Sequence, residues 1–176
     1  MYIPEEIEKI LFTEEEIQKK VSEMGETLTR EYAGKNPLFL CVLRGATVFF
    51  SDLIRCIAAP LEIDFLRASS YIGSDSSGEV HLETSAIPDV LGRDIVLVED
   101  IVDTARTLSL LTAEIKKRGA ASLRTAALLD KPSRRVVKDF KADYTGFEID
   151  DLFVVGYGLD YSQRFRNLPY IGVYKA

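Results

Sequence analysis

Apolar residues recur along this chain with two different periods, and the two periods alternate. After Thr13-Glu14-Glu15-Glu16, which has the pattern of a capping box, apolar side chains follow at the spacing of one helical face, and Gly34 is the expected helix end. The runs 37–43 and 95–98 are continuously apolar, as in strands that are buried on both faces of a parallel sheet. The pattern therefore predicts a helix followed by buried strands.

Each of these two strands leads into a helical pattern. Apolar positions continue from Phe49 to Ile57 after the first strand, and from Leu108 to Ile115 after the second, where Gly119 is the expected end. Alternating strands and helices predict an α/β fold, with a mainly parallel sheet and helices on both faces. The chain has 176 residues and no linkers or repeats, so residues 1–176 are expected to form a single domain. Further strand-like runs lie at 61–68, 79–85, 122–129 and 153–155.

Composition and charge narrow the class of protein. The chain is 47% hydrophobic and 28% charged, as globular proteins are, and its net charge of −6 argues against general affinity for nucleic acid. No apolar run is long enough to span a membrane, and the first residues lack the basic and apolar segments of a secretory signal. Cys41 and Cys56 are expected to be buried thiols in a reducing compartment. We therefore expect a cytoplasmic protein.

The stretch 93–109 carries the densest candidate chemistry. Glu99 and Asp100 directly follow the buried run, and Asp103-Thr104-Ala105-Arg106-Thr107 then turns the chain into the next helix. Ligands of open α/β sheets lie outside the carboxyl ends of the strands, and the N–H groups at a helix N-terminus suit a phosphate. Ionised carboxylates only accept hydrogen bonds, so the acidic pair suits the hydroxyls of a sugar. The pattern indicates a loop that holds a ribose together with its 5′-phosphate.

Other segments add groups that suit a second anion and an aromatic ligand. Arg44-Gly45-Ala46 lies at a strand-to-helix turn, where backbone amides and a positive charge can face an anion. The polar segment 69–78 has the composition of a lid and contains Ser70-Tyr71. Lys131 follows a strand in Leu-Leu-Asp-Lys-Pro, and residues 153–161 read Phe-Val-Val-Gly-Tyr-Gly-Leu-Asp-Tyr. Taken singly, each segment also fits an ordinary turn, a hairpin loop or a solvated side chain.

In this order, the segments resemble the motifs of the type I phosphoribosyltransferases, and more closely those of the bacterial hypoxanthine(-guanine) enzymes. The acidic pair and the following Asp-Thr-Ala-Arg-Thr resemble the motif that binds phosphoribosyl pyrophosphate, with Ala105 where the family usually has Gly. The resemblance runs from about Ile10 to the C-terminus. It implies the type I phosphoribosyltransferase fold, with a flexible hairpin loop and a small hood formed by the N-terminal segment and residues from about 130 to 176.

The resemblance also implies an activity in purine salvage. The enzyme would transfer the 5-phosphoribosyl group from phosphoribosyl pyrophosphate to hypoxanthine or guanine and release pyrophosphate, and it would act as a homodimer or homotetramer. Mg²⁺ is the implied cofactor, contacted by Glu99, Asp100 and Asp160. Asp103 is the implied catalytic base.

The remaining roles that the resemblance implies concern the two substrates and the lid. Lys131, Phe153 and Val154 would bind the purine, and Ser70 and Tyr71 would belong to the lid. The residues implied to bind phosphoribosyl pyrophosphate are Arg44, Gly45, Glu99, Asp100, Asp103, Thr104, Ala105, Arg106, Thr107 and Arg166.

Three alternatives stay open at this point. A xanthine-preferring 6-oxopurine phosphoribosyltransferase would share these motifs, because the sequence does not determine the order of preference among the purines. A two-component receiver domain is also α/β and has an acidic pair, but that pair follows its first strand, whereas Glu99 and Asp100 lie past the middle of this chain. A relative of the same fold that regulates by binding RNA would need a basic face, which the net charge of −6 disfavours.

Overall fold

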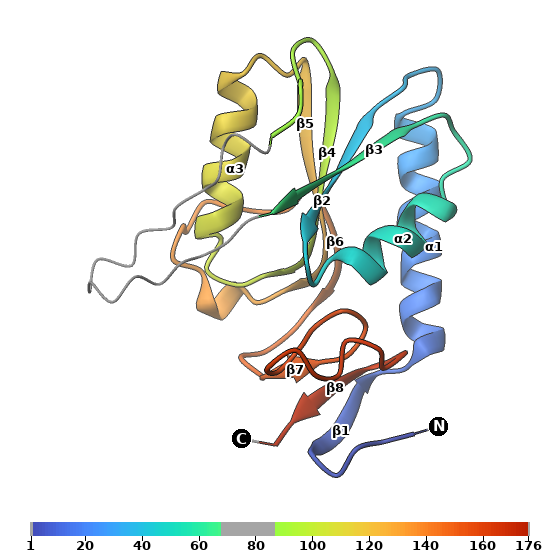
Figure 1. The fold of residues 1–176 in the computed structure, drawn as a ribbon, viewed down its shortest axis with the longest axis vertical. Coiled ribbons are helices and arrows are strands. Elements are labelled where there is room, and N and C mark those ends of the chain that lie inside the picture. The colour runs from blue at the N-terminus through green and yellow to red at the C-terminus, as the bar shows by residue number, and fades with distance from the viewer. Residues whose placement is uncertain (1, 68–86, 176) are drawn as a thin grey trace.

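The computed structural model describes residues 2–67 and 87–175. Its larger sheet has five parallel strands in the order β3-β2-β4-β5-β6, which confirms the predicted parallel α/β fold. In Figure 1, α1 and α2 lie on one side of this sheet and α3 lies on the other. The strands are β2 Leu38–Leu43, β3 Glu62–Arg67, β4 Asp94–Val102, β5 Ser122–Asp130 and β6 Tyr144–Glu148, and the helices are α1 Glu14–Glu31, α2 Thr47–Arg55 and α3 Arg106–Lys117.

Strand β4 lies at the centre of the sheet and is apolar on both faces. Its Val96 and Val98 pack with side chains of α1 and α2, whereas its Ile95 and Leu97 pack with side chains of α3. All four are fully buried. Successive side chains of a strand point to opposite faces, so two helical layers require a continuous apolar run rather than an alternating one. This placement explains the pattern in the sequence.

The helix ends follow the capping residues closely, with one difference. The predicted capping box is confirmed, because Thr13 Oγ1 accepts from the Glu16 N–H at 3.3 Å and the Glu16 carboxylate accepts from the Thr13 N–H at 2.8 Å. Gly119 follows the C-cap of α3 with φ +84°, as expected for a helix-ending glycine. Helix α1 ends earlier than predicted, at Glu31, and Gly34 lies two residues beyond its C-cap.

A second, smaller sheet lies beside the carboxyl ends of the parallel strands (Figure 1). It consists of β1 Ile7–Phe12, β8 Ile171–Tyr174 and β7 Val154–Val155, all antiparallel. It has a small core of its own that contains the fully buried Tyr170. We refer to this sheet and the loop 156–170 as the hood. Sequence periodicity assigned no strand to β1, β6 or β8, because their residues form neither a long continuous apolar run nor a regular alternation.

Parts of the chain that were expected to form the lid lie outside the described residues. These include Ser70 and Tyr71 and the expected return strand 79–85. Among the helices of residues 2–67 and 87–175, none has the length and apolar content that a bilayer crossing needs.

Candidate active site

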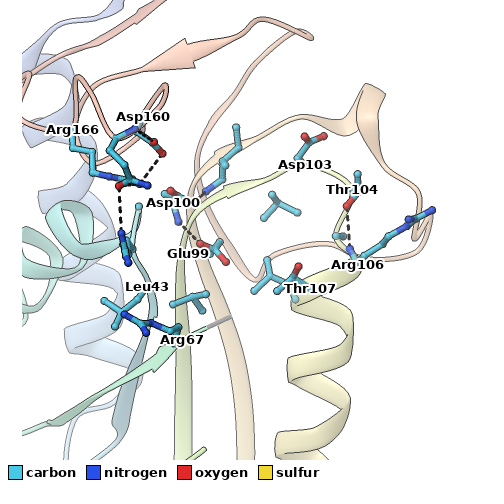
Figure 2. Close-up of a pocket in the computed structure, with 18 residues that line it drawn as sticks. Leu43, Arg67, Glu99, Asp100, Asp103, Thr104, Arg106, Thr107, Asp160 and Arg166 are labelled. Carbon is cyan, nitrogen blue, oxygen red and sulfur yellow. Dashed lines mark hydrogen bonds and ion pairs between the residues drawn. The ribbon is translucent and has the colours of Figure 1, made fainter. Parts of the chain in front are cut away.

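A polar cleft of about 810 Å³ lies at the carboxyl ends of β2 and β4, under the hood. Figure 2 shows the acidic pair in the middle of this cleft, the hood residues Asp160 and Arg166 on one side, and the start of α3 on the other. All ten residues that the sequence predicted around phosphoribosyl pyrophosphate line it: Arg44, Gly45, Glu99, Asp100, Asp103, Thr104, Ala105, Arg106, Thr107 and Arg166. The cleft brings together three segments that are far apart in the sequence.

Glu99 and Asp100 belong to the last part of β4, which continues to Val102 rather than ending before the pair. Burial raises the pKa of Glu99 well above its usual range, and the charge of Asp100 raises it further. Burial also raises the pKa of Asp100, against the opposing effects of hydrogen bonds from Glu99 and the Ile101 N–H and of the charge of Arg166. The surrounding protein therefore stabilises two negative charges at this pair poorly. The pair suits a ligand that supplies hydroxyl donors or a cation.

Gly45 is packed directly against the carboxylate of Asp100. A Cβ at position 45 would lie 1.6 Å from Asp100 Oδ2, which only glycine avoids. The hood approaches the same turn from the other side, since a Cβ on Gly158, whose φ is +100°, would lie 2.1 Å from the Gly45 carbonyl oxygen. Gly158, Gly45 and Asp100 are thus packed against one another in a row. The peptide bond between Leu43 and Arg44, just before Gly45, is cis. Gly158 lies in the string 153–161 of the sequence analysis but had no predicted role.

The turn from Asp103 into α3 differs in one respect from a simple helix cap. The N-cap residue is Ala105, in the left-handed region with φ +63°, and it makes no side-chain cap hydrogen bond. Asp103 therefore does not cap the helix, and its carboxylate instead accepts a hydrogen bond from Arg134 Nε. Thr104 Oγ1 accepts from the Arg106 N–H at 3.4 Å, and the first turn of α3 lines the cleft. A left-handed residue here explains why the family usually has Gly at this position.

Arg135, for which the sequence suggested no role, supports the Asp103 turn from behind. Its guanidinium is buried, pairs with Asp130, and donates to the carbonyl oxygens of Val102 at 3.1 Å and of Asp103 at 2.7 Å. The Thr104 carbonyl oxygen accepts from two N–H groups of the segment that follows Arg135. The loop after β5 therefore holds the backbone of the candidate base in place.

The hood contributes a hydrogen-bonded group of opposite charges. Arg166 pairs with Asp160 at 2.8 Å, donates to the Gly158 carbonyl oxygen at 2.7 Å, and donates to Gln163 Oε1 at 3.3 Å. Arg44 also donates to Gln163 Oε1, at 3.5 Å. Gln163 therefore links the two arginines that were predicted to face pyrophosphate. Gln163 and Arg67 line the cleft as well, and the sequence singled out neither for a role.

A second hollow of about 580 Å³ adjoins the cleft and shares Asp100, Asp103 and Asp160 with it. The three residues predicted to bind the purine, Lys131, Phe153 and Val154, all line it. The Lys131 side chain is buried, with the residue 8% exposed, and its ammonium makes no hydrogen bond or ion pair within residues 2–67 and 87–175.

The rest of this hollow is lined by an aromatic ring and by charged side chains. Phe153 makes T-shaped contacts with the rings of Tyr161 and Tyr174, and it is still 51% exposed. Arg134 and Asp151, to which the sequence assigned no role, also line the hollow. The hollow thus combines a half-exposed aromatic ring, the ammonium of a mostly buried lysine and a carboxylate.

The carboxylates predicted to contact magnesium are not preassembled into a cage. Among the described residues, no group of three or more His, Cys, Asp or Glu side chains could hold a metal ion. Of the three predicted carboxylates, Asp160 pairs with Arg166. The other two, Glu99 and Asp100, are hard oxygen donors that repel each other. Mg²⁺ is bound through one or two carboxylates together with substrate phosphates and waters, so this donor set fits the ion.

The fold and the cleft define an α/β protein with a polar site at the carboxyl edge of a parallel sheet, covered by a small hood. The chain belongs to the phosphoribosyltransferase family, because the phosphoribosyl transferase domain matches residues 9–162. It is 54% identical over 171 residues to the hypoxanthine-guanine phosphoribosyltransferase of Bacillus subtilis, covering 97% of this chain and 94% of that protein.

Further similar proteins extend this finding over the full length. The hypoxanthine-guanine phosphoribosyltransferase of Streptococcus thermophilus is 48% identical over 174 residues, which cover 98% of this chain and 96% of that protein. The crystal structure of a hypoxanthine phosphoribosyltransferase from Staphylococcus aureus superimposes with a TM-score of 0.90 at 43% identity, covering 97% of this chain and 92% of that one. The family predicted from the sequence is confirmed.

Proposed function

We propose that this chain transfers the 5-phosphoribosyl group from phosphoribosyl pyrophosphate to the ring nitrogen of hypoxanthine or guanine in purine salvage. The observation that carries the proposal is the pair of adjoining hollows that share Asp100 and Asp103. One is polar and contains the acidic pair and the start of α3, and the other contains an aromatic ring and a mostly buried lysine. The names of similar proteins support the same assignment.

The larger cleft would hold phosphoribosyl pyrophosphate by its three polar parts. Glu99 and Asp100 would accept hydrogen bonds from the ribose hydroxyls. The turn from Thr104 to Thr107 would bind the 5′-phosphate through N–H groups and hydroxyls at the start of α3. Arg44, Gly45 and Arg166 would face the pyrophosphate, whose negative charge grows as it departs.

The reaction would form one carbon–nitrogen bond and break one carbon–oxygen bond. The purine nitrogen supplies the electron pair for the new bond to C1′ of the ribose, and the electrons of the C1′–O bond leave with the pyrophosphate. The proton of the purine passes to the carboxylate of Asp103, which lines both hollows. A positioned base of this kind contributes about 10²–10⁴-fold to a rate.

Magnesium would be held by Glu99 and Asp100, with Asp160 as a further contact. When bound, it supplies positive charge that stabilises the developing charge on phosphate oxygens. The raised pKa of Glu99 and of Asp100 supports the assignment, because a cation beside the pair would relieve the repulsion that raises the pKa of Glu99. Loss of turnover in excess chelator, and its recovery on adding Mg²⁺, would test it.

The purine hollow would select the base at its position 6. Phe153 would stack on the ring, and Val154 would contact its edge through the backbone. Lys131, whose ammonium has three donors and no acceptor, would donate to the 6-oxygen of hypoxanthine or guanine. Adenine has a donor at that position, and sites built to hydrogen-bond one group reject analogues that lack it by roughly 10⁴-fold.

The deciding experiment is nucleotide formation from phosphoribosyl pyrophosphate with hypoxanthine, guanine, xanthine and adenine in turn. We expect turnover of hypoxanthine and guanine and negligible use of adenine, with Lys131→Ala losing most of the 6-oxopurine activity. Comparable efficiency with adenine and hypoxanthine would contradict the roles of Lys131 and of the hollow. The same assay measures xanthine, which the motifs leave undecided.

The remaining assignments concern assembly and location. The prediction of a homodimer or homotetramer is supported by two exposed apolar side chains, Ile63 and Phe65, on the edge strand β3, and light scattering after size exclusion would test it. The prediction of a cytoplasmic location is supported by Cys41 and Cys56, both free thiols. Fractionation of the source cells would test the location.

A further inference from the structure

The carboxylate of Asp103 already has a partner in the purine hollow. Arg134 Nε lies 3.3 Å from Asp103 Oδ1, and the same Nε lies 3.7 Å from Asp151 Oδ1. All three side chains line the hollow, and between 40% and 55% of each is exposed. One guanidinium therefore lies between the candidate base and a second carboxylate, at the place where a purine would bind.

The backbone around Arg134 is held close to Asp103 by its neighbour. Arg134 ends the short 3₁₀ helix Pro132–Arg134, and the next residue, Arg135, is buried against Asp130 and the carbonyl oxygens of Val102 and Asp103. Arg134 thus extends from an anchored backbone, and half of its side chain is exposed. The anchored backbone keeps the guanidinium within reach of both Asp103 and Asp151.

The contact with Arg134 is in competition with the reaction. A carboxylate has about four acceptor sites, and the bond from Arg134 takes one of them, on Oδ1. The guanidinium also occupies space in the hollow that a purine N–H needs to approach the carboxylate. A guanidinium has five donors, and the nearby Asp151 gives it a second carboxylate to bind. Arg134 can therefore withdraw from Asp103 when the purine arrives and keep its charge paired. Without Asp151, withdrawal would leave the guanidinium without a counter-charge.

We propose that Arg134 is a positioning residue for Asp103, and that Asp151 is the partner to which it moves when the purine binds. This inference rests on the proposed function. In the free protein, Arg134 holds the Asp103 carboxylate directed into the hollow. In the complex with purine, Asp103 is released to take the proton, and the pair between Arg134 and Asp151 closes the hollow beside it.

The proposal predicts effects of opposite sign for the two partners. In Arg134→Gln, the competing donor is lost, so KM for the purine should fall about two- to fivefold, as fits a partly exposed ion pair. The single-turnover rate should fall about tenfold, because the carboxylate loses its orientation. In Asp151→Asn, Arg134 stays on Asp103, so KM for the purine should rise.

A double variant distinguishes this mechanism from two independent effects. Because Asp151 acts only through Arg134, Arg134→Gln combined with Asp151→Asn should behave as Arg134→Gln alone. Arg134→Lys, which keeps the charge, should recover part of the rate. Arg124→Gln is the matched control. Arg124 is exposed to a similar extent and makes an ion pair with Asp143, and neither residue lines either hollow. This variant should change neither the purine KM nor the single-turnover rate.

The experiment is quench-flow and steady-state kinetics on the full chain with hypoxanthine, with thermal unfolding of each variant measured alongside. A rise in purine KM for Arg134→Gln would overturn the proposal, as would an Asp151→Asn effect that persists in the double variant. If Arg134→Gln unfolds at a lower temperature than the unmodified protein, Arg134→Lys replaces it in the comparison. Arg134→Lys must then change the purine KM and the single-turnover rate in the same direction, by smaller amounts. Absence of turnover in the unmodified protein would instead contradict the proposed function itself.

Discussion

Gly45→Ala provides a direct test of how the pyrophosphate turn and the acidic pair depend on each other. The new Cβ would lie 1.6 Å from Asp100 Oδ2 and 2.7 Å from its Cγ, whereas ordinary contacts begin at 3.4 Å. The carboxylate must therefore retreat by about 1.8 Å, the difference between these two distances. A misplacement of about 1 Å near a reacting centre costs on the order of 10²-fold. We expect kcat/KM for phosphoribosyl pyrophosphate to fall about 100-fold, or ~2.7 kcal/mol.

The fold should tolerate this substitution better than the site does. Gly45 is not among the glycines with positive φ, so alanine meets no backbone strain there, and it reduces the entropy of the unfolded chain by the equivalent of about 0.4–1 kcal/mol. Urea unfolding should therefore show a midpoint close to that of the unmodified protein, while initial rates at varied phosphoribosyl pyrophosphate show the loss.

A double-mutant cycle isolates the collision. In Asp100→Ala, the oxygen and the Cγ are absent, and the nearest remaining atom to the new methyl group is the Cβ of residue 100, at an ordinary 3.6 Å. Gly45→Ala should then cost less than about 0.5 kcal/mol in that background, within the usual error of additivity. A loss as large as in the unmodified protein would refute the reasoning, because it would place the effect of Gly45 somewhere other than Asp100.

Three further substitutions test the acidic pair, the base and the turn. The raised pKa of Glu99 means that the folded chain binds the proton of this carboxyl more tightly than the unfolded chain, so the free energy of unfolding should fall as pH rises above 4.5 towards the raised value. Glu99→Gln should weaken this fall, measured as urea midpoints from acid to neutral pH, and an unchanged dependence of the midpoint on pH would contradict the argument. Asp103→Asn should lower the single-turnover rate about 10²–10⁴-fold with little change in unfolding, because Ala105 and not Asp103 caps α3; full activity would exclude the base. Ala105→Val should lower the free energy of unfolding by about 2 kcal/mol, since a left-handed φ of +63° disfavours a branched side chain, whereas Ala105→Gly should stay within about 1 kcal/mol; equal stabilities of these two variants would argue against strain at this turn.

The class of fold and the location of the main motif follow from local patterns in the amino-acid sequence. Continuous apolar runs such as 95–98 identify strands that are covered on both faces, and helical spacing identifies the helices between them. The capping box at Thr13 and the end of α3 at Gly119 were also predictable, because each depends on a few neighbouring residues. The same holds for the acidic pair and the turn that follows it, which lie within one short stretch.

The contacts between separate segments follow from the packing of the whole fold. The sheet that pairs β1 with β8 joins the two ends of the chain, and the close approach of Gly158 to Gly45 joins the hood to the turn after β2. Such contacts depend on packing across more than one hundred residues of sequence, which local periodicity does not contain.

The partners of the charged side chains also required the three-dimensional arrangement. In the sequence, Arg134 and Arg135 are one basic pair after a proline. In the fold, Arg135 is buried against backbone carbonyl oxygens, whereas Arg134 lies between Asp103 and Asp151 in the purine hollow. The sequence identifies which residues carry charge, but burial and distance determine which charge each one meets, and these are properties of the packed chain.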